Sequence, residues 1–104
     1  MDAMDSLTAA IALVIDNDKS ELQWALGTVR SLEADPDVFN VRRAMAEELQ
    51  ERVAVNTSYA MTTTKQPYLS YLECAISHVA NNADWHALAQ HYMDKVDEGV
   101  TVPE

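Results

Sequence analysis

DWHALAQHYMDKVDEG, residues 84–99, is the stretch that indicates the fold class most directly. Its apolar residues recur every three or four positions, which places their side chains on one face of a helix; they are Trp85, Leu88, Ala89, Tyr92 and Val96. Asn82 or Asp84 provides an N-cap, and Gly99 stands where helices commonly end. The sequence therefore predicts an amphipathic helix, followed by a loose tail over residues 100–104.

Three segments upstream also predict helices. Asp18 and Glu21 resemble a capping box ahead of an apolar stripe that ends near residue 34. Asp35 and Pro36 are typical of an N-cap and first helical position, so the next helix is expected over residues 36–54. A further helix is predicted to start after Pro67 and to end at Asn81 and Asn82, with one apolar stripe facing inward: Leu69, Leu72, Ile76 and Val79.

The first segment, residues 7–15, is apolar on almost every side and predicts a largely buried helix. Because a short apolar run does not distinguish helix from strand by its period, a strand over residues 12–15 is the alternative. The segment is far shorter than the roughly 20 residues that span a bilayer. Acidic residues precede it, whereas a secretory signal begins with positive charge. We therefore expect a cytoplasmic protein without a membrane anchor.

Residues 56–67 lack an apolar stripe and are rich in threonine and serine. This composition predicts one long polar loop. A short strand over residues 58–63 is the alternative, although a single strand needs a partner. Structureless connections of this length are uncommon in small domains and often functional.

A chain of 104 residues has room for one hydrophobic core. Its 2 glycines and 3 prolines supply too little turn material for a β-sandwich, and no glycine cluster is present to hold a phosphate. We therefore predict an all-α fold, a compact bundle of four to five helices that forms a single domain over residues 1–99.

The net charge of −10 opposes nonspecific attraction to nucleic acids and anionic membranes. The basic residues gather in the middle of the chain, and both ends are acidic. We expect a protein partner, with a basic surface as one option. Self-association is also an option, because the apolar side chains of the first helix need more packing partners than a small bundle provides.

No assembled catalytic or metal site emerges from the sequence. Asp16 and Asp18 start like a calcium loop, but Glu21 stands where that loop needs glycine. His86 and His91 lie five positions apart and so do not share a helix face. The lone Cys74 lies in an apolar pattern that favours a buried, inert thiol. We therefore expect no metal, no cofactor and no enzymatic activity.

Exposed aromatic residues are the usual anchors of protein interfaces. Trp24 lies beside the apolar stripe of its helix, and three tyrosines lie in or next to the predicted loop. The acidic residues of the third helix lie on its outer face. The candidate partner-binding residues are Trp24, Glu47, Glu48, Glu51, Tyr59, Tyr68 and Tyr71. The alternative role of the aromatic residues is to close the edges of the bundle.

Two segments resemble small acidic proteins of phages and other mobile elements: residues 11–18, IALVIDND, with Trp24 after them, and residues 84–92, DWHALAQHY. The tryptophan expected near residues 8–10 in the first motif is missing. The resemblance implies an accessory protein without established enzymatic activity, and it carries over no catalytic residues.

The leading hypothesis is a non-catalytic protein that inhibits or modulates a host protein, with mimicry of nucleic acid as a sharper version. The alternative is a homo-oligomer that binds a small anion such as a nucleotide between subunits. Its candidate ligand-binding residues are Arg42, Arg43, Thr62, Thr63, Thr64 and Lys65. A small enzyme built on His78 or His86 is the third hypothesis.

Overall fold

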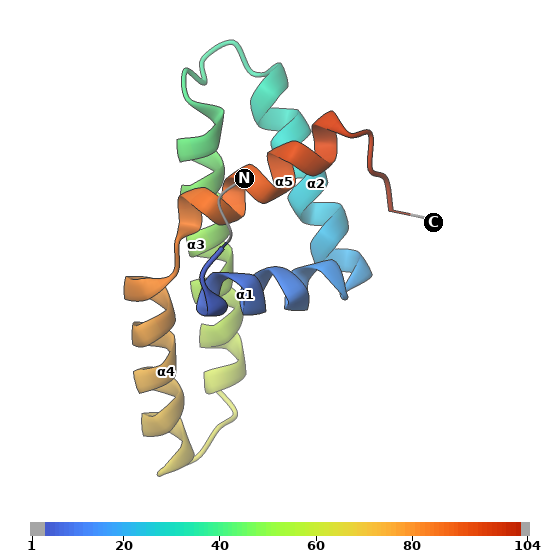
Figure 1. Ribbon diagram of the computed structural model, residues 1–104. Helices are drawn as coiled ribbons and strands as arrows, with labels where there is room; N and C mark the ends of the chain where they lie inside the picture. Colours follow the sequence, from blue (N-terminus) through green and yellow to red (C-terminus); the bar gives the residue numbers. More distant parts are fainter. Residues whose placement is uncertain (1–3, 103–104) are drawn as a thin grey trace.

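A computed structural model describes residues 4–102, which fold into five α-helices (Figure 1). They are α1 (Ser6–Asp16), α2 (Lys19–Ala34), α3 (Val41–Met61), α4 (Tyr68–Asn82) and α5 (Trp85–Asp97). The all-α prediction is confirmed, and the first segment is a helix and not a strand. None of the helices over residues 4–102 is long and apolar enough to cross a membrane.

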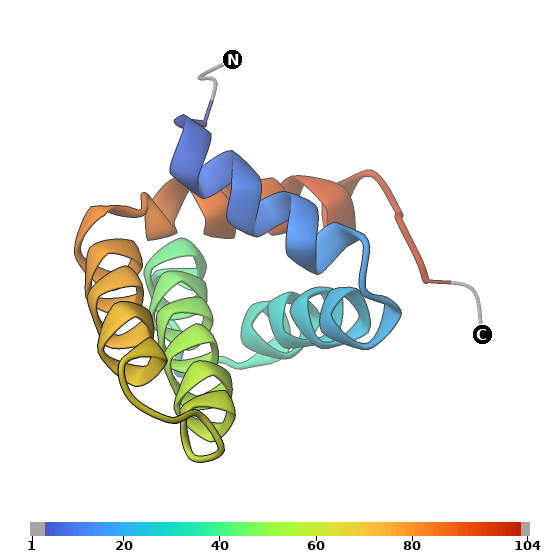
Figure 2. The same ribbon diagram turned by 90° about the horizontal axis from the view of Figure 1, so that it is seen from below.

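The hydrophobic core lies where α2, α3 and α5 meet, with α1 across one side (Figure 2). Its apolar members include Leu26, Val29, Met45, Leu49, Leu88 and Tyr92, all almost fully enclosed. Full burial of one such aliphatic side chain contributes roughly 1.5–3 kcal/mol. The apolar stripe of α5 thus reaches the centre of the molecule, as its spacing predicted.

Hydrogen-bonded caps define where most helices begin. Asp18 accepts from the Glu21 N–H at 3.1 Å, and Asp84 accepts from the Ala87 N–H at 3.0 Å. The predicted start of α3 at Pro36 is wrong, because Asn40 caps that helix by accepting from the Arg43 N–H. The Asp35 side chain accepts instead from the Asp37 N–H two residues ahead, which forms a local turn.

The predicted long loop is wrong, since α3 continues to Met61 and leaves only residues 62–67 as the connection. The strand alternative is wrong as well, because residues 58–61 are helical. Thr57 and Ser58 donate their hydroxyls to the carbonyls of Val53 and Ala54, one turn back. These bonds satisfy the two hydroxyls without interrupting the helix.

The second half of α3, the connection and α4 project from the rest of the molecule, as Figure 1 shows at its lower end. We call residues 53–82 the arm and the remainder the body. α4 packs against α3 and has no buried residue. Cys74 is therefore exposed, which contradicts the prediction of a buried thiol.

The prediction of a largely buried helix is wrong for α1. Ala12 and Ile15 reach the core, but Leu13 and Val14 are mostly exposed. A helix at the edge of a small domain has neighbours on one side only, so the apolar composition of residues 7–15 exceeds what the fold covers.

Polar contacts join the two ends of the chain. The buried Thr8 Oγ1 accepts from the Asp84 N–H at 2.9 Å, which ties α1 to the start of α5. His91 Nε2 lies 3.0 Å from Asp16 Oδ2. Arg30 donates to the Val100 carbonyl at 2.9 Å, and Val100 and Val102 pack against the core.

Candidate protein-binding interface

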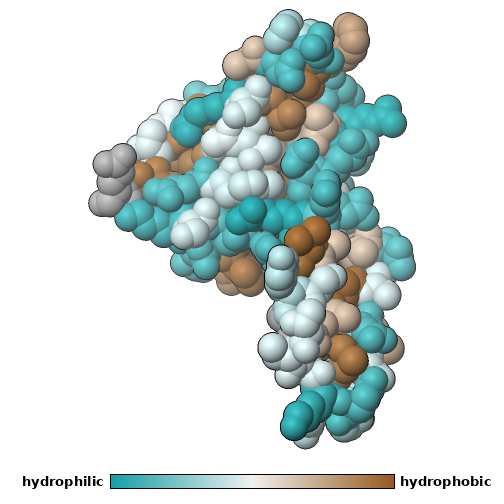
Figure 3. Space-filling model, turned by 180° about the vertical axis from the view of Figure 1, so that it is seen from behind, coloured by the Kyte–Doolittle hydropathy of each residue, from teal (hydrophilic) through white to brown (hydrophobic). Residues whose placement is uncertain are grey.

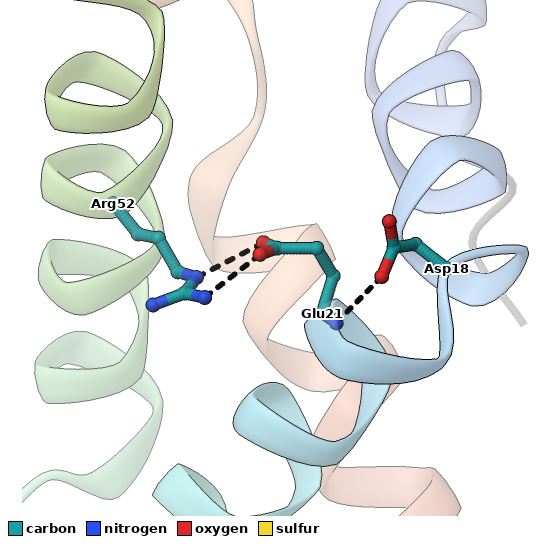
Figure 4. A network of polar contacts seen from close by, with 3 residues as sticks. All are labelled: Asp18, Glu21 and Arg52. Carbon is teal, nitrogen blue, oxygen red and sulfur yellow. Dashed lines mark hydrogen bonds and ion pairs between the residues drawn. The ribbon is translucent and has the colours of Figure 1, made fainter. Parts of the chain in front are cut away.

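Arg52 anchors α3 to α2 at the point where α3 leaves the body (Figure 4). Its guanidinium donates two hydrogen bonds to the Glu21 carboxylate, 2.9 Å from Nε and 2.7 Å from Nη2. These bonds raise the pKa of Arg52 above its usual value. Arg52 Cζ also lies 4.3 Å from the centre of the Trp24 ring, a cation–π contact. Trp24 is therefore held in place while half-buried at the surface.

One face of α3 carries exposed side chains around Arg52 and along the arm. Glu48, Glu51, Val55 and Tyr59 follow at intervals of three or four residues and so share a helix face. Tyr59 is 73% exposed and Val55 47%. We call Glu48, Glu51, Arg52, Val55, Tyr59 and the adjoining Trp24 the outer face. It unites four predicted partner-binding residues, and Val55 was missed although its spacing from Glu51 and Tyr59 signals it.

The other side of α3 forms an apolar groove with α4. The groove has a volume of about 230 Å³. Its walls are Gln50, Val53, Ala54, Thr57, Leu72, Ala75, Ile76, Val79, Ala80 and Trp85. Figure 3 shows apolar side chains in a line along the lower lobe of the molecule, where the arm projects.

Tyr68 and Tyr71 belong to the same arm but lie on α4. They are 66% and 67% exposed, with their ring centres 6.5 Å apart in an edge-to-face arrangement. The structure therefore divides the predicted tyrosines between two helices. Sequence reasoning missed the groove itself, because the groove forms only where α3 packs against α4.

A polar hollow adjoins the groove at the body. It shares Gln50 and Trp85 with the groove, and both side chains donate to the Ala80 carbonyl at 3.2 Å. The other walls of the hollow are Arg43, Ala46, Glu47, Ala83, Asp84 and His86. Glu47 lies 3.6 Å from Arg43 in an exposed pair, which contributes little to stability.

The residues proposed to bind an anionic ligand lie at opposite ends of α3 and do not form one site within a single chain. Arg42 and Arg43 lie in the first turn of α3, whereas residues 62–65 follow its last turn. Twenty helical residues at about 1.5 Å each separate the two groups by roughly 30 Å. Only an arrangement of several subunits would bring them together.

The histidines lie apart from one another in the fold. His91 contacts Asp16, His78 Nδ1 lies 3.1 Å from the Asn82 amide, and His86 lines the polar hollow. Within residues 4–102, no group of three metal-ligating side chains comes together. Burial and the neighbouring Asp16 raise the pKa of the Tyr92 hydroxyl, which keeps it protonated.

No protein-family model, curated protein or solved structure matches this chain.

Proposed function

We propose that this protein is a non-catalytic protein-binding module that presents the outer face of α3 to its partner. The observation that carries the proposal is Tyr59, 73% exposed on α3 and aligned with Val55 on the same helix face. A large aromatic side chain on a fixed backbone gives an interface much contact area at little entropic cost.

The neighbours of Tyr59 support the same function. Arg52 holds Trp24 against the body, so a second aromatic surface is already ordered before any partner arrives. Glu48 and Glu51 are exposed beside it and favour a partner whose interface has a basic rim. The resemblance to phage and mobile-element proteins supports a protein of the host cell as that partner.

This proposal differs from nucleic-acid mimicry in its physical basis. Mimicry requires a continuous acidic surface, and its binding weakens steeply as salt rises. The outer face instead combines two aromatic residues and a valine with two carboxylates. An interface centred on aromatic residues depends only mildly on ionic strength.

Capture experiments with immobilised protein test the proposal. Wild-type protein and the Tyr59→Ser variant are exposed to the same host extract at low and high ionic strength. We expect wild-type protein to retain its partner at both salt concentrations, and Tyr59→Ser to weaken the purified complex at least tenfold.

The Leu13→Ser variant is the matched control, because Leu13 is also apolar and mostly exposed but lies on α1. It should bind the partner as the wild type does. Equal binding by Tyr59→Ser would contradict the proposal. Loss of wild-type binding at moderate salt would favour mimicry instead.

A further inference from the structure

The arm differs in charge from the rest of the chain. Residues 53–82 contain one basic and one acidic residue, Lys65 and Glu73, so the net charge of −10 belongs to the body and the terminal residues. Depletion of charge together with enrichment in tyrosine is the composition of the centre of a protein interface.

The arm also leaves its groove without cover. Two packed helices enclose only the side on which they meet, and α4 accordingly has no buried residue. Ala54 and Ala75 line the groove and are exposed. A second helical hairpin against this side would complete a four-helix bundle, in which all four helices share one core.

We propose that the groove is filled by the arm of a second copy of this chain, packed antiparallel about a two-fold axis. Two copies with a net charge of −10 repel each other over most of their surfaces. Because the arm has no net charge, the arms of two copies can approach each other without this electrostatic repulsion. The inference uses the groove side of α3 and does not depend on the outer face.

The size of the arm suits a weak dimer. Its groove side is about 20 Å long and two helices, about 20 Å, wide. The resulting area, roughly 400 Å² per partner, lies below the roughly 600 Å² per partner at the lower end of stable interfaces. We therefore expect the dimer to form at high protein concentration.

Charge complementarity specifies the antiparallel direction. Lys65 follows the end of α3 at the tip of the arm, whereas Glu47 lies on α3 in the polar hollow beyond the other end of the groove. An antiparallel packing therefore brings Lys65 of one copy toward the Glu47 end of the other copy. A parallel arrangement would place the two Lys65 ammonium groups side by side, where they repel.

Sedimentation of the full chain under reducing conditions tests the proposal, with Ala75→Glu as the variant. Ala75 is exposed in the single chain and glutamate is a good helix former, so circular dichroism should be unchanged. We expect a wild-type dimer whose dissociation constant rises at least tenfold in Ala75→Glu, since a carboxylate would be buried in the interface.

Ala10→Glu is the control, because it adds the same charge at an exposed position of α1. It should dimerise as the wild type does. A monomeric wild-type protein at the highest soluble concentration would overturn the proposal. Dimerisation of Ala75→Glu with wild-type affinity would overturn it as well.

Charge reversal tests the register. Lys65→Glu and Glu47→Lys should each weaken the dimer several-fold, and the double variant should recover wild-type affinity because the opposite charges meet again. A double variant that dimerises no better than either single variant would overturn the antiparallel arrangement.

Discussion

Thr8 is the buried polar side chain that joins the first helix to the last. It is fully enclosed, and its Oγ1 accepts from the Asp84 N–H at the start of α5. A backbone donor at a helix start has no partner within the helix, so the threonine satisfies a group that water cannot reach easily.

Thr8→Val should lower the free energy of unfolding by about 1–2 kcal/mol, because valine keeps the shape and removes the acceptor. Urea denaturation followed by circular dichroism measures the change. Thr101→Val, at an exposed position, is the control and should have no effect beyond a few tenths of a kcal/mol. A loss in Thr8→Val no larger than in the control would contradict the role assigned to Thr8.

The buried hydroxyl of Tyr92 makes the free energy of unfolding depend on pH. Its hydroxyl is buried beside Asp16, and the folded state raises its pKa above the usual value near 10. The unfolded chain therefore loses this proton at a lower pH than the folded one does. The resulting stability is fully present below about pH 10 and is lost as the pH rises beyond it.

We expect the unfolding free energy of the wild type to fall by up to about 1.4 kcal/mol per pH unit above pH 10 relative to Tyr92→Phe. Denaturation of both proteins between pH 8 and about pH 11 supplies the comparison. Parallel curves would show that Tyr92 titrates alike in the folded and unfolded states.

At the scale of elements, Arg52 determines how α3 is attached to α2. The Arg52–Glu21 pair is bidentate, and both side chains are about a quarter to a third exposed. Partial exposure weakens such a pair through solvent screening, while its geometry strengthens it.

A double-mutant cycle with Glu21→Gln and Arg52→Met should give a coupling energy of about 1 kcal/mol. Thermal or urea unfolding of the four proteins provides the values. Additive effects, within about 0.3 kcal/mol, would mean that the pair contributes nothing of its own.

Elements also show where sequence reasoning succeeded and where it failed. The apolar stripes of α2 and α5 and the cap at Asp18 follow from local patterns and were predicted correctly, and Asp84 is one of the two caps predicted for α5. The run from Asn56 to Thr64 misled prediction, because threonine and serine weaken isolated helices. The hydroxyls of Thr57 and Ser58 bond to carbonyls one turn back, and the packing of α3 against α4 overrides the weak local preference for helix.

The candidate interface was less predictable than the helices. Trp24 and Tyr59 were identified as candidate interface residues, but the placement of Tyr59 on one face of α3 required that helix to continue to Met61. The groove depends on the packing of α3 against α4. Such pairing between segments is not encoded in any local spacing.

At the scale of the whole molecule, the body and the arm differ in stability. The body contains the enclosed core, whereas α4 contributes no buried residue. Segments with little burial open locally at a low cost in free energy.

Hydrogen exchange of the wild type at two protein concentrations should reveal this difference. We expect amides of α4 to exchange faster after dilution, because dissociation of the dimer uncovers them, and amides of α5 to be unaffected. Ala75→Glu should show fast exchange in α4 at both concentrations. Exchange in wild-type α4 that does not change on dilution would contradict this expectation.

The contact between Thr8 and Asp84 has a consequence for folding during synthesis on the ribosome. The two residues are separated by 76 positions, so α1 leaves the ribosome long before its partner is made. At about 5–20 residues per second, the delay is roughly 4–15 s. During that time the apolar side of α1 has no α5 to cover it. A translation product cut short before α5 therefore remains unfolded and reaches chaperones and proteases instead of its partner.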